Sequence, residues 1–468
     1  MKLNIKNFIG LTKSILVLTL ALVISGCATT GGNSFKIKEH KEITLSNGLK
    51  VYLIPDQSLP YTSYELLVKV GSVNDPQGQE GISSFVGTML KKGTRNMSAL
   101  GIADELGQVG SHLSIYTAND YTMISSSGLS FHQDKVLDVF SQIITEPSFN
   151  SMEIVRLRKQ YNASFQKTVD NPSHLASIAF NEYLYQDHPY GRRSQGTPSS
   201  LKEIKKKHII KFYRKYFRPN NSMLSVVGNY PKNIKQILED KFGNWKVRKS
   251  KTIEFPVKSP INGYQVQLVH KPGLKQSEVR IGHYGIKRTD KDFLSIRLAN
   301  MILGGGFTSR LMADIRVKRG LTYGVSSQFS SKLDGGSFLI NTSTRHEKVG
   351  EIVSRSLSVL DEFVKKGVTE EEVNSSKALL KGSFPRAIET AEKLASNLLI
   401  LKFYGIGEDY LNDYMKNIDK LTTAEVNRVI KQRFKSKDLK ILVLSPKASK
   451  AQLKALGDIN MKSYKDFL

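Results

Sequence analysis

Cysteine and paired histidines are what this sequence of 468 residues lacks most clearly. Cys27 is the only cysteine, so the chain has no internal disulfide and its stability depends on a hydrophobic core. The nine histidines are scattered, and the two closest, His270 and His283, are 13 positions apart. No pair has the i, i+4 spacing that puts two ligands on one helix face. We therefore expect no zinc site built within this chain alone.

Acidic residues are scarce relative to basic ones. Lys and Arg number 69 against 42 Asp and Glu, which gives a formal net charge of +27. The basic residues are mostly Lys and are spread along the chain, without an arginine-rich tail, a zinc-finger spacing or a helix-turn-helix pattern. We expect no nucleic-acid partner, and a solvated basic surface suited to anionic lipid or acidic peptides.

No apolar run is long enough to span a bilayer, but a shorter one lies near the N-terminus. Three lysines precede the apolar stretch 15–24, which has the layout of a secretory signal. The stretch leads into Ile-Ser-Gly-Cys at 24–27, which resembles a bacterial lipobox, in which the cysteine is acylated and becomes the first mature residue. The alternative is that Cys27 is a free buried thiol that follows an N-terminal hydrophobic helix.

The residues around Cys27 favour lipidation. Small residues precede it and a short tether, Ala-Thr-Thr-Gly-Gly at 28–32, follows it. Multiple acyl chains would hold the protein stably at a membrane. Because position 28 is Ala and not Asp, the usual sorting pattern implies the outer membrane. We predict a signal peptide at 1–26, a lipidated tether at 27–40, and a protein anchored in the outer membrane that faces the periplasm.

The mature chain is a tandem repeat. Its length of about 440 residues suits two to four domains. Residues 204–217 and 421–434 both read as amphipathic helices that end in Phe, and each precedes an apolar strand, at 223–228 and 440–445. Matching order and spacing indicate two copies of one fold.

The boundary between the copies is a stretch rich in Lys, Arg and Ser with two prolines, at 247–262. Such a composition is typical of a linker. We therefore predict an N-terminal peptidase-like domain at 41–246 and a C-terminal one at 263–468.

Each half runs from strands to helices. In the first half a Ser-Asn-Gly turn at 46–48 predicts a hairpin, and alternation or helical spacing predicts the remaining elements. The order predicts an α+β fold of two tandem homologous domains, each a largely antiparallel sheet with helices packed on one face. The expected elements are strands at 42–45, 49–54, 64–70 and 116–127 and helices at 83–90 and 136–144.

Several motifs occur in a characteristic order over residues 40–445. They are Thr44–Val51, Gly71-Ser72 with Gly81, Met89–Thr94, His188–Arg192, Arg218–Asn221, Gly304–Leu311 and Gly320–Gly324. Together they resemble the pitrilysin/insulinase peptidase family. The resemblance implies two α+β domains that form half of a clam-shell chamber, and a complete peptidase made of two such chains.

The zinc motif of active members of that family is missing. They carry His-x-x-Glu-His on the first-half helix, where two His bind zinc and the Glu polarises the attacking water. Here Ser84 and Thr88 stand at the histidine positions and Gly87 at that of the glutamate. A further Glu is expected near 163–165, yet none occurs between 153 and 182. The resemblance therefore implies a chain that is inactive on its own and holds no cofactor, with zinc in a partner subunit.

A possible peptide grip remains in the second half. In this family a non-catalytic half can supply an Arg and a Tyr near the partner's metal, and the matching residues are Arg316 and Tyr323. We expect a helix at 311–318, a cap at Gly320 and a strand that opens at Tyr323. An Arg fork and a phenol could hydrogen-bond a peptide carbonyl. Alternatively, Arg316 and Arg319 complement the helix C-terminus and Tyr323 packs across strands.

The glycine run Gly304, Gly305 and Gly306 permits close backbone approach. It is either a substrate-contacting loop, as in the mitochondrial processing peptidase, or a tight turn that caps a helix from Thr308. No Gly-Lys-Ser/Thr follows, so it is not a phosphate-binding loop.

Two functional hypotheses of different class follow. The first is a non-catalytic subunit of a zinc-dependent metalloendopeptidase of this family, which closes the chamber and grips peptide substrates beside a zinc-bearing subunit. The alternative is a stand-alone peptide-binding or scaffolding lipoprotein without peptidase activity. A third hypothesis, a peptidase with a different site, has less support.

Overall fold

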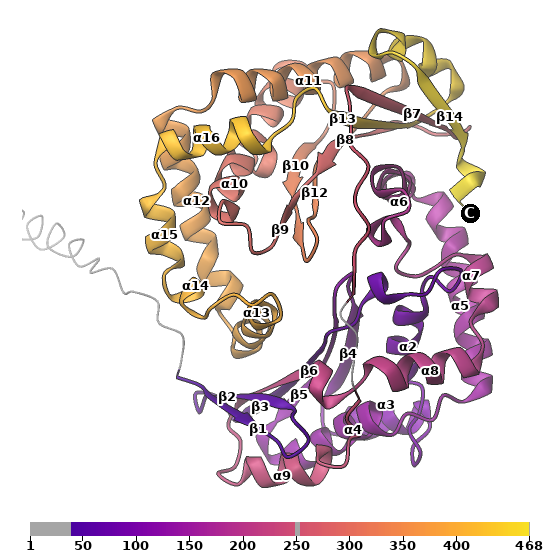
Figure 1. Cartoon of the computed structure of the whole chain (residues 1–468), viewed down its shortest axis with the longest axis vertical. Helices are drawn as coiled ribbons and strands as arrows, with labels where there is room; N and C mark the ends of the chain where they lie inside the picture. The colour runs from indigo at the N-terminus through magenta and orange to yellow at the C-terminus, as the bar shows by residue number, and fades with distance from the viewer. Residues whose placement is uncertain (1–38, 249–252, 468) are drawn as a thin grey trace, which may run out of the picture.

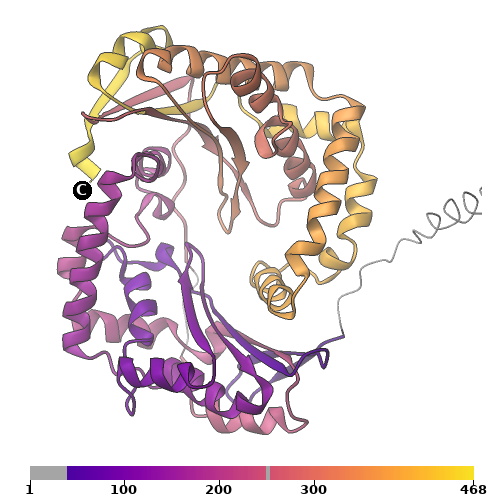
Figure 2. The ribbon, with the colours of Figure 1, turned by 180° about the vertical axis from the view of Figure 1, so that it is seen from behind.

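The chain folds into two halves, each built on a six-stranded sheet (Figure 1). The computed structural model describes residues 39–248 and 253–467. The predicted signal peptide, Cys27 and the tether up to residue 38 lie outside the described residues. No helix of the described part is long and apolar enough to cross a membrane. Figure 2 shows the same two halves from behind.

The first sheet has the order β1-β2-β6-β3-β5-β4. β2 and β6 run parallel, and every other neighbouring pair is antiparallel. The predicted turn at 46–48 joins β1 to β2, with Gly48 at φ +83° and its N–H donating to Leu45 O at 2.8 Å. The strands are β1 (Lys41–Thr44), β2 (Lys50–Pro55), β3 (Tyr61–Val68), β4 (His112–Thr117), β5 (Thr122–Leu129) and β6 (Ser222–Gly228).

The helices of the first half follow the predicted order. In α4 the apolar residues at helical spacing are buried, as the pattern at 136–144 predicts. Short 3-10 turns lie at Ser72–Asn74, Ser130–His132, Pro189–Gly191 and Pro219–Asn221. The helices are α2 (Ile82–Leu90), α3 (Ala99–Gly107), α4 (Gln133–Thr145), α5 (Ser151–Asp170), α6 (Pro172–Tyr185), α7 (Pro198–Glu203), α8 (Lys206–Tyr216) and α9 (Ile234–Phe242).

The second sheet has the order β10-β12-β8-β13-β7-β14. β13 and β14 run parallel to β7, and the other pairs are antiparallel. A two-stranded parallel pair, β9 (Ile286–Lys287) with β11 (Ser331–Lys332), lies beside it. The strands are β7 (Tyr264–His270), β8 (Ser277–Tyr284), β10 (Val325–Phe329), β12 (Ser337–Thr344), β13 (Leu439–Ser445) and β14 (Ile459–Ser463).

The helices of the second half include two π-helical segments, η6 (Met301–Gly305) and η7 (Met312–Lys318). 3-10 segments lie at His346–Lys348, Lys447–Leu456 and Tyr464–Phe467. The α-helices are α10 (Phe293–Asn300), α11 (Val349–Lys366), α12 (Glu370–Ile388), α13 (Ala391–Phe403), α14 (Asp409–Asn412), α15 (Tyr414–Lys420) and α16 (Thr423–Arg433).

The two halves repeat one topology. The neighbour order and directions of β2, β6, β3, β5 and β4 match those of β7, β13, β8, β12 and β10. The helices before β6 and β13 are α8 and α16, as predicted. The copies differ at one edge, where β1 is antiparallel to β2 but β14 is parallel to β7. The α+β fold of two tandem, largely antiparallel domains is confirmed.

One predicted strand is wrong in detail. Residues 116–127 were expected as a single strand, but the structure divides them between β4 and β5, which pair antiparallel around a turn at 118–121. The Ala118 N–H donates to Tyr121 O at 2.8 Å and closes this turn. Alternation continues through both strands of a hairpin, so the pattern alone does not reveal the turn.

Each sheet also carries one helix from the other half. One face of the first sheet packs on α2, α3, α4, α8 and α9, and the opposite face packs on α13. In the second half, α6 of the first half packs in the same way on β8 and β13. Figure 1 shows α6 beside β8 and α13 beside β6. The halves therefore exchange helices, which the sequence patterns did not predict.

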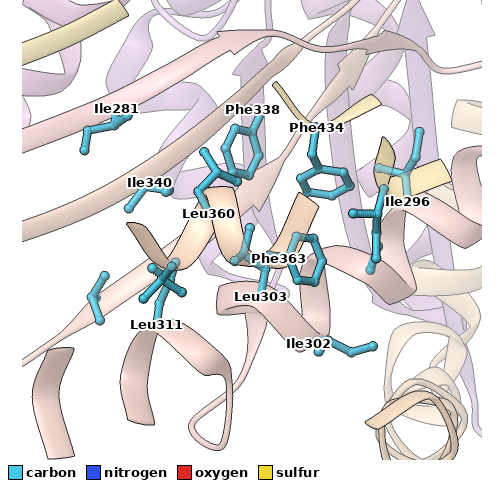
Figure 3. Packing of buried hydrophobic residues seen from close by; sticks show 14 of the residues in the cluster. Ile281, Ile296, Ile302, Leu303, Leu311, Phe338, Ile340, Leu360, Phe363 and Phe434 are labelled. Carbon is cyan, nitrogen blue, oxygen red and sulfur yellow. The ribbon is translucent and has the colours of Figure 1, made fainter. Parts of the chain in front are cut away.

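The core of the second half holds the segments that carry the glycine run. The rings of Phe434 and Phe338 pack with centroids 5.3 Å apart, and Phe363 lies 5.4 Å from Phe434 (Figure 3). Leu303 and Leu311, which flank the glycines, are fully buried in the same cluster. Burying one leucine contributes about 2 kcal/mol, so both ends of this segment are anchored.

Candidate functional site

The helix at the predicted metal-site position is α2. It begins after Gly81, which has φ +92°, and the carboxylate of Asp75 accepts hydrogen bonds from Gly81 N at 2.7 Å and Ser83 N at 3.0 Å. These bonds satisfy N–H groups that the first turn of a helix leaves free. The start of α2 is therefore fixed, and with it the positions of Ser84, Gly87 and Thr88.

The hydroxyls at the two histidine positions are engaged in local hydrogen bonds. Ser84 Oγ donates to Ser194 O at 2.6 Å, and Thr88 Oγ1 donates to Ser84 O at 2.9 Å. The Tyr161 hydroxyl lies 2.9 Å from Thr88 Oγ1. Neutral hydroxyls, bonded to one another and to backbone carbonyls, thus occupy the positions at which the resemblance predicts metal ligands.

Tyr161 was not predicted as part of this site. It comes from α5, its ring packs edge-on against Phe85 at 5.6 Å, and its hydroxyl also lies 3.3 Å from Ser84 O. Burial raises its pKa, so it stays a neutral phenol. Within the window 163–165, where the further Glu was expected, Phe165 turns into the core. The signal that could have identified Tyr161 is its place one helical turn before Phe165.

Gly87 faces the edge strand β4. A Cβ at this position would lie 2.9 Å from Thr117 Oγ1 and 3.4 Å from Ile115 Cγ2. The position that carries the general base in active members therefore has no side chain here and little room for one. Gly87 itself has no group that could polarise a water molecule.

These residues line a small cavity of about 270 Å³ with β4 as one wall. Ser84, Thr88 and Tyr161 supply only neutral oxygens, whereas zinc in proteins takes His nitrogen, Cys sulfur or carboxylate oxygen. Nowhere in residues 39–248 and 253–467 do three His, Cys, Asp or Glu side chains gather to hold a metal ion. The residues do not fit the zinc of active family members.

The glycine run of the second half lies in a separate groove of about 580 Å³. Gly304 and Gly305 end η6, and Gly306 is extended. The run therefore ends the preceding helical segment, and Gly306 O also accepts a hydrogen bond from Ser309 N at 3.2 Å in the turn that leads into the next one. A Cβ on Gly304 would lie 2.6 Å from Ser327 N, so close contact with β10 requires glycine there. Ser173 of α6 completes the wall from the other half.

Arg316 and Tyr323 lie at the border of this groove but do not line it. The Arg316 guanidinium lies 4.9 Å from the ring centroid of Phe307, which lines the groove and is 70% exposed. Tyr323 is 87% exposed and precedes Gly324, another wall residue. The strand expected to open at Tyr323 begins at Val325, so the tyrosine sits in a loop. Phe307 is the residue that the sequence reasoning missed, although it directly follows the glycines.

The carboxylate closest in sequence to Arg316, that of Asp314, pairs with two other arginines. Arg319 and Arg355 both donate to the Asp314 carboxylate, at 3.1 and 3.0 Å. Among the described residues no carboxylate lies within ion-pair distance of Arg316. The alternative in which Tyr323 packs across strands does not hold, because its side chain is exposed. An unpaired guanidinium and an exposed phenol next to a groove can bind an extended backbone.

Two family models match the chain. The model described as "Insulinase (Peptidase family M16)" matches residues 50–197, and "Peptidase M16 inactive domain" matches residues 203–380. An "Uncharacterized zinc protease" of Rickettsia felis (strain ATCC VR-1525 / URRWXCal2) is 32% identical over 359 residues, which cover 75% of this chain and 85% of that protein. The chain belongs to the insulinase family M16. The predicted resemblance is thereby confirmed.

Other M16 relatives differ in what they are named. A "Non-peptidase homolog YmxG" of Helicobacter pylori (strain ATCC 700392 / 26695) is 25% identical over 417 residues, covering 87% of this chain and 94% of that protein. The crystal structure of a peptidase M16 inactive domain from Pseudomonas fluorescens superposes with a TM-score of 0.81 at 26% identity. It covers 87% of this chain and 98% of that one, so the whole two-half arrangement is common to both.

Proposed function

We propose that this M16 chain is the non-catalytic subunit of a zinc-dependent endopeptidase in the cell envelope, where it closes the chamber and grips the peptide. The observation that carries the proposal is the contrast between its two sites. The metal position holds Ser84, Gly87 and Thr88, while Arg316 beside Phe307 keeps an unpaired guanidinium next to a groove. A chain that served only as a scaffold would have no need of the second feature.

In this proposal the subunit binds and orients the peptide and does not itself cleave it. The Arg316 fork can donate two N–H bonds to a peptide carbonyl, and the Tyr323 hydroxyl can donate a third. Both groups would be aimed at an oxygen near the zinc of the other subunit, where negative charge develops during cleavage. The zinc, the attacking water and the general base belong to that partner in this proposal.

The location follows from the N-terminal sequence. We propose that Cys27 carries the lipid and anchors the subunit in the outer membrane, facing the periplasm. Cys27→Ser should release the protein from the membrane fraction, and labelling with a fatty-acid analogue should be lost. Retention of the Ser variant in membranes after a high-salt wash would contradict the anchor.

Purification of the tagged chain from detergent-solubilised membranes tests the assembly. A stoichiometric partner that carries an intact His-x-x-Glu-His helix is expected. In the reconstituted pair, Arg316→Ala and Tyr323→Phe should lower kcat/KM about tenfold or more, the effect of losing a charge-assisted bond to the transition state.

Arg319→Ala is the matched control, because Arg319 lies three residues away and pairs with Asp314. It should leave kcat/KM within about twofold, in line with an exposed ion pair. If the pair that contains Arg316→Ala has the same kcat/KM as the native pair, Arg316 does not bind the substrate. Isolation as a homodimer without any peptidase would favour a stand-alone peptide-binding or scaffolding lipoprotein.

A further inference from the structure

A third cavity, larger than the two described above, lies in the helical layer of the first half. Its volume is about 1030 Å³, and its walls come from α8, the end of α9 with the residues that follow, and the 145–149 segment after α4. This layer covers the face of the first sheet opposite to the one that α13 covers. No residue that lines this cavity also lines the cavity at α2 or the Gly304 groove, so the three are separate.

The walls of this cavity are strongly basic. Two carboxylates, Glu146 and Asp240, face seven cationic side chains. Among the described residues only one of the seven is paired, by a bond of 2.6 Å from Lys241 to Asp138. The seven cations are Arg95, Lys206, Arg214, Arg218, Lys241, Lys246 and Arg248.

Arg218 is the buried member of the group. Its side chain is 6% exposed, and it donates from Nε to Arg214 O at 2.6 Å and from Nη1 to Lys246 O at 3.2 Å. Carbonyls satisfy its N–H groups but leave its charge without a counter-ion. Burial lowers its pKa, and the nearby positive charges of Arg248 and Arg214 lower it further. A buried cation among like charges is the arrangement that an anion stabilises.

Three aromatic side chains, Phe149, Tyr213 and Trp245, also line the cavity. Trp245 is 5% exposed, and its indole N–H makes no hydrogen bond of good geometry, although it lies near the Tyr213 hydroxyl. Phe149 has φ +46° and packs edge-on against Tyr213 at 5.2 Å. The left-handed backbone at a phenylalanine costs energy and is held in place by this packing. This packing holds Phe149 and Tyr213 in place beside the basic residues of the cavity.

We propose that this cavity binds a phosphate-bearing anion with several negative charges. Arginine forks match phosphate oxygens, and a single charge would not balance this wall. The shared chemistry is phosphate, from either a lipid headgroup at the membrane or a soluble oligophosphate. The proposal does not depend on the peptidase role, because no residue of the cavity belongs to the Arg316 groove or to the α2 site.

Trp245 provides the assay, because it is the only tryptophan in the chain and lines the cavity. Titration of the full chain, in detergent, with inorganic tripolyphosphate should change its fluorescence with saturation. Lys206→Gln together with Arg214→Gln should weaken binding about tenfold or more, as expected for two phosphate contacts.

The matched control is Lys207→Gln with Lys211→Gln, on the same helix and also exposed, but outside the cavity. It removes the same charge and should change affinity less than about threefold, the effect of general electrostatics. All four side chains are exposed, so both double variants are expected to fold. Equal weakening by the two doubles, or no saturable response of the native chain, overturns the site.

Vesicles separate the two sources of phosphate. Vesicles of cardiolipin, whose headgroup carries two phosphates, in phosphatidylethanolamine should bind the native chain more than the cavity variant if the ligand is a headgroup, and tripolyphosphate should compete. Tripolyphosphate binding that vesicles do not affect supports a soluble oligophosphate. Vesicle binding identical for the native chain and the cavity variant, with no response to tripolyphosphate, rejects the proposal.

Discussion

Glu65 and Ser396 lie 331 positions apart in sequence, yet Ser396 Oγ is 2.6 and 2.8 Å from the two carboxylate oxygens of Glu65. Glu65 belongs to β3 and Ser396 to α13, so the contact joins the two halves. The opposite exchange has a similar contact, in which Arg280 of β8 donates to Ser173 O of α6 at 2.9 Å. Polar groups thus fix the position of each exchanged helix.

Glu65 predicts a pH dependence of stability. Its side chain is 6% exposed, and burial raises its pKa to about 7, although the Ser396 bond opposes the shift. Because the folded pKa lies above the unfolded one, the folded state binds the proton more tightly. The contribution of Glu65 is therefore most favourable below about pH 4.5 and is lost as the pH rises to about 7.

Glu65→Gln should remove this loss while keeping an acceptor for Ser396. We expect the free energy of unfolding of the variant to exceed that of the native chain by about 1–3 kcal/mol at pH 8. The two free energies should converge as the pH approaches about 4.5. Urea unfolding at both pH values measures the difference. Glu347→Gln, at a residue whose side chain is 66% exposed, is the control and should show no such trend. A constant difference between native and Glu65→Gln at all pH values would contradict the assignment.

Gly304→Ala and Gly306→Ala form a matched pair. A methyl group at 304 would lie 2.6 Å from a backbone nitrogen of β10, whereas the nearest atom at 306 is the flexible Met301 sulfur at 3.5 Å. We expect Gly304→Ala to lose about 1–3 kcal/mol by overpacking and Gly306→Ala to change by less than about 0.5 kcal/mol. Chemical denaturation of both variants measures the two changes in the free energy of unfolding. Similar losses at the two positions would mean that the approach to β10 is not the constraint.

The hydroxyl network of the degenerate site should contribute to stability. Thr88→Val and Tyr161→Phe each remove one hydroxyl from the contact of 2.9 Å. Each is expected to cost about 1 kcal/mol, and the double variant about 0.5–1 kcal/mol less than the sum. Unfolding free energies of the native chain, both single variants and the double variant give this coupling. Strict additivity would show that the two hydroxyls act independently.

Metal chelation should leave the isolated chain unchanged. A ligand that binds the folded state raises the apparent unfolding temperature, and its removal lowers it. Because Ser84 and Thr88 are not zinc ligands, neither EDTA nor one equivalent of zinc should shift the unfolding temperature. A zinc-bearing M16 peptidase treated in parallel is the positive control. A drop in the chain's unfolding temperature with EDTA would reveal a metal site of another kind.

Local patterns predicted the strands β1, β2, β3, β6 and β13 and the helices α2, α4, α8 and α16. The turn at 46–48 has the residues that a hairpin requires, and the repeated helix-to-strand segments identified the two copies. The turn at 118–121 was not predicted because the alternation of apolar and polar residues continues across it without a break. Its Asn119 and Asp120 were the available turn signal. The positions of these elements were within reach because each depends on residues close together in sequence.

The exchange of α6 and α13 could not be predicted in this way. Apolar spacing shows that a helix has a buried face, but it does not identify the sheet that covers the face. Tyr161 was missed for a related reason. Its contact with Thr88 depends on how α5 is rotated about its axis relative to α2, and sequence spacing alone does not determine that rotation. The assignment of Ser84, Gly87 and Thr88 to the metal positions stays a prediction, which rests on a motif with fixed spacing.

The exchanged helices also set the order in which the protein can finish folding. The apolar face formed by Tyr52, Ile54 and Leu67 belongs to the first strands to emerge, but its cover, α13, ends at Phe403. Until that point in synthesis, the face stays exposed and can associate with other chains. Truncation before residue 391 should therefore yield aggregates in place of a smaller folded domain.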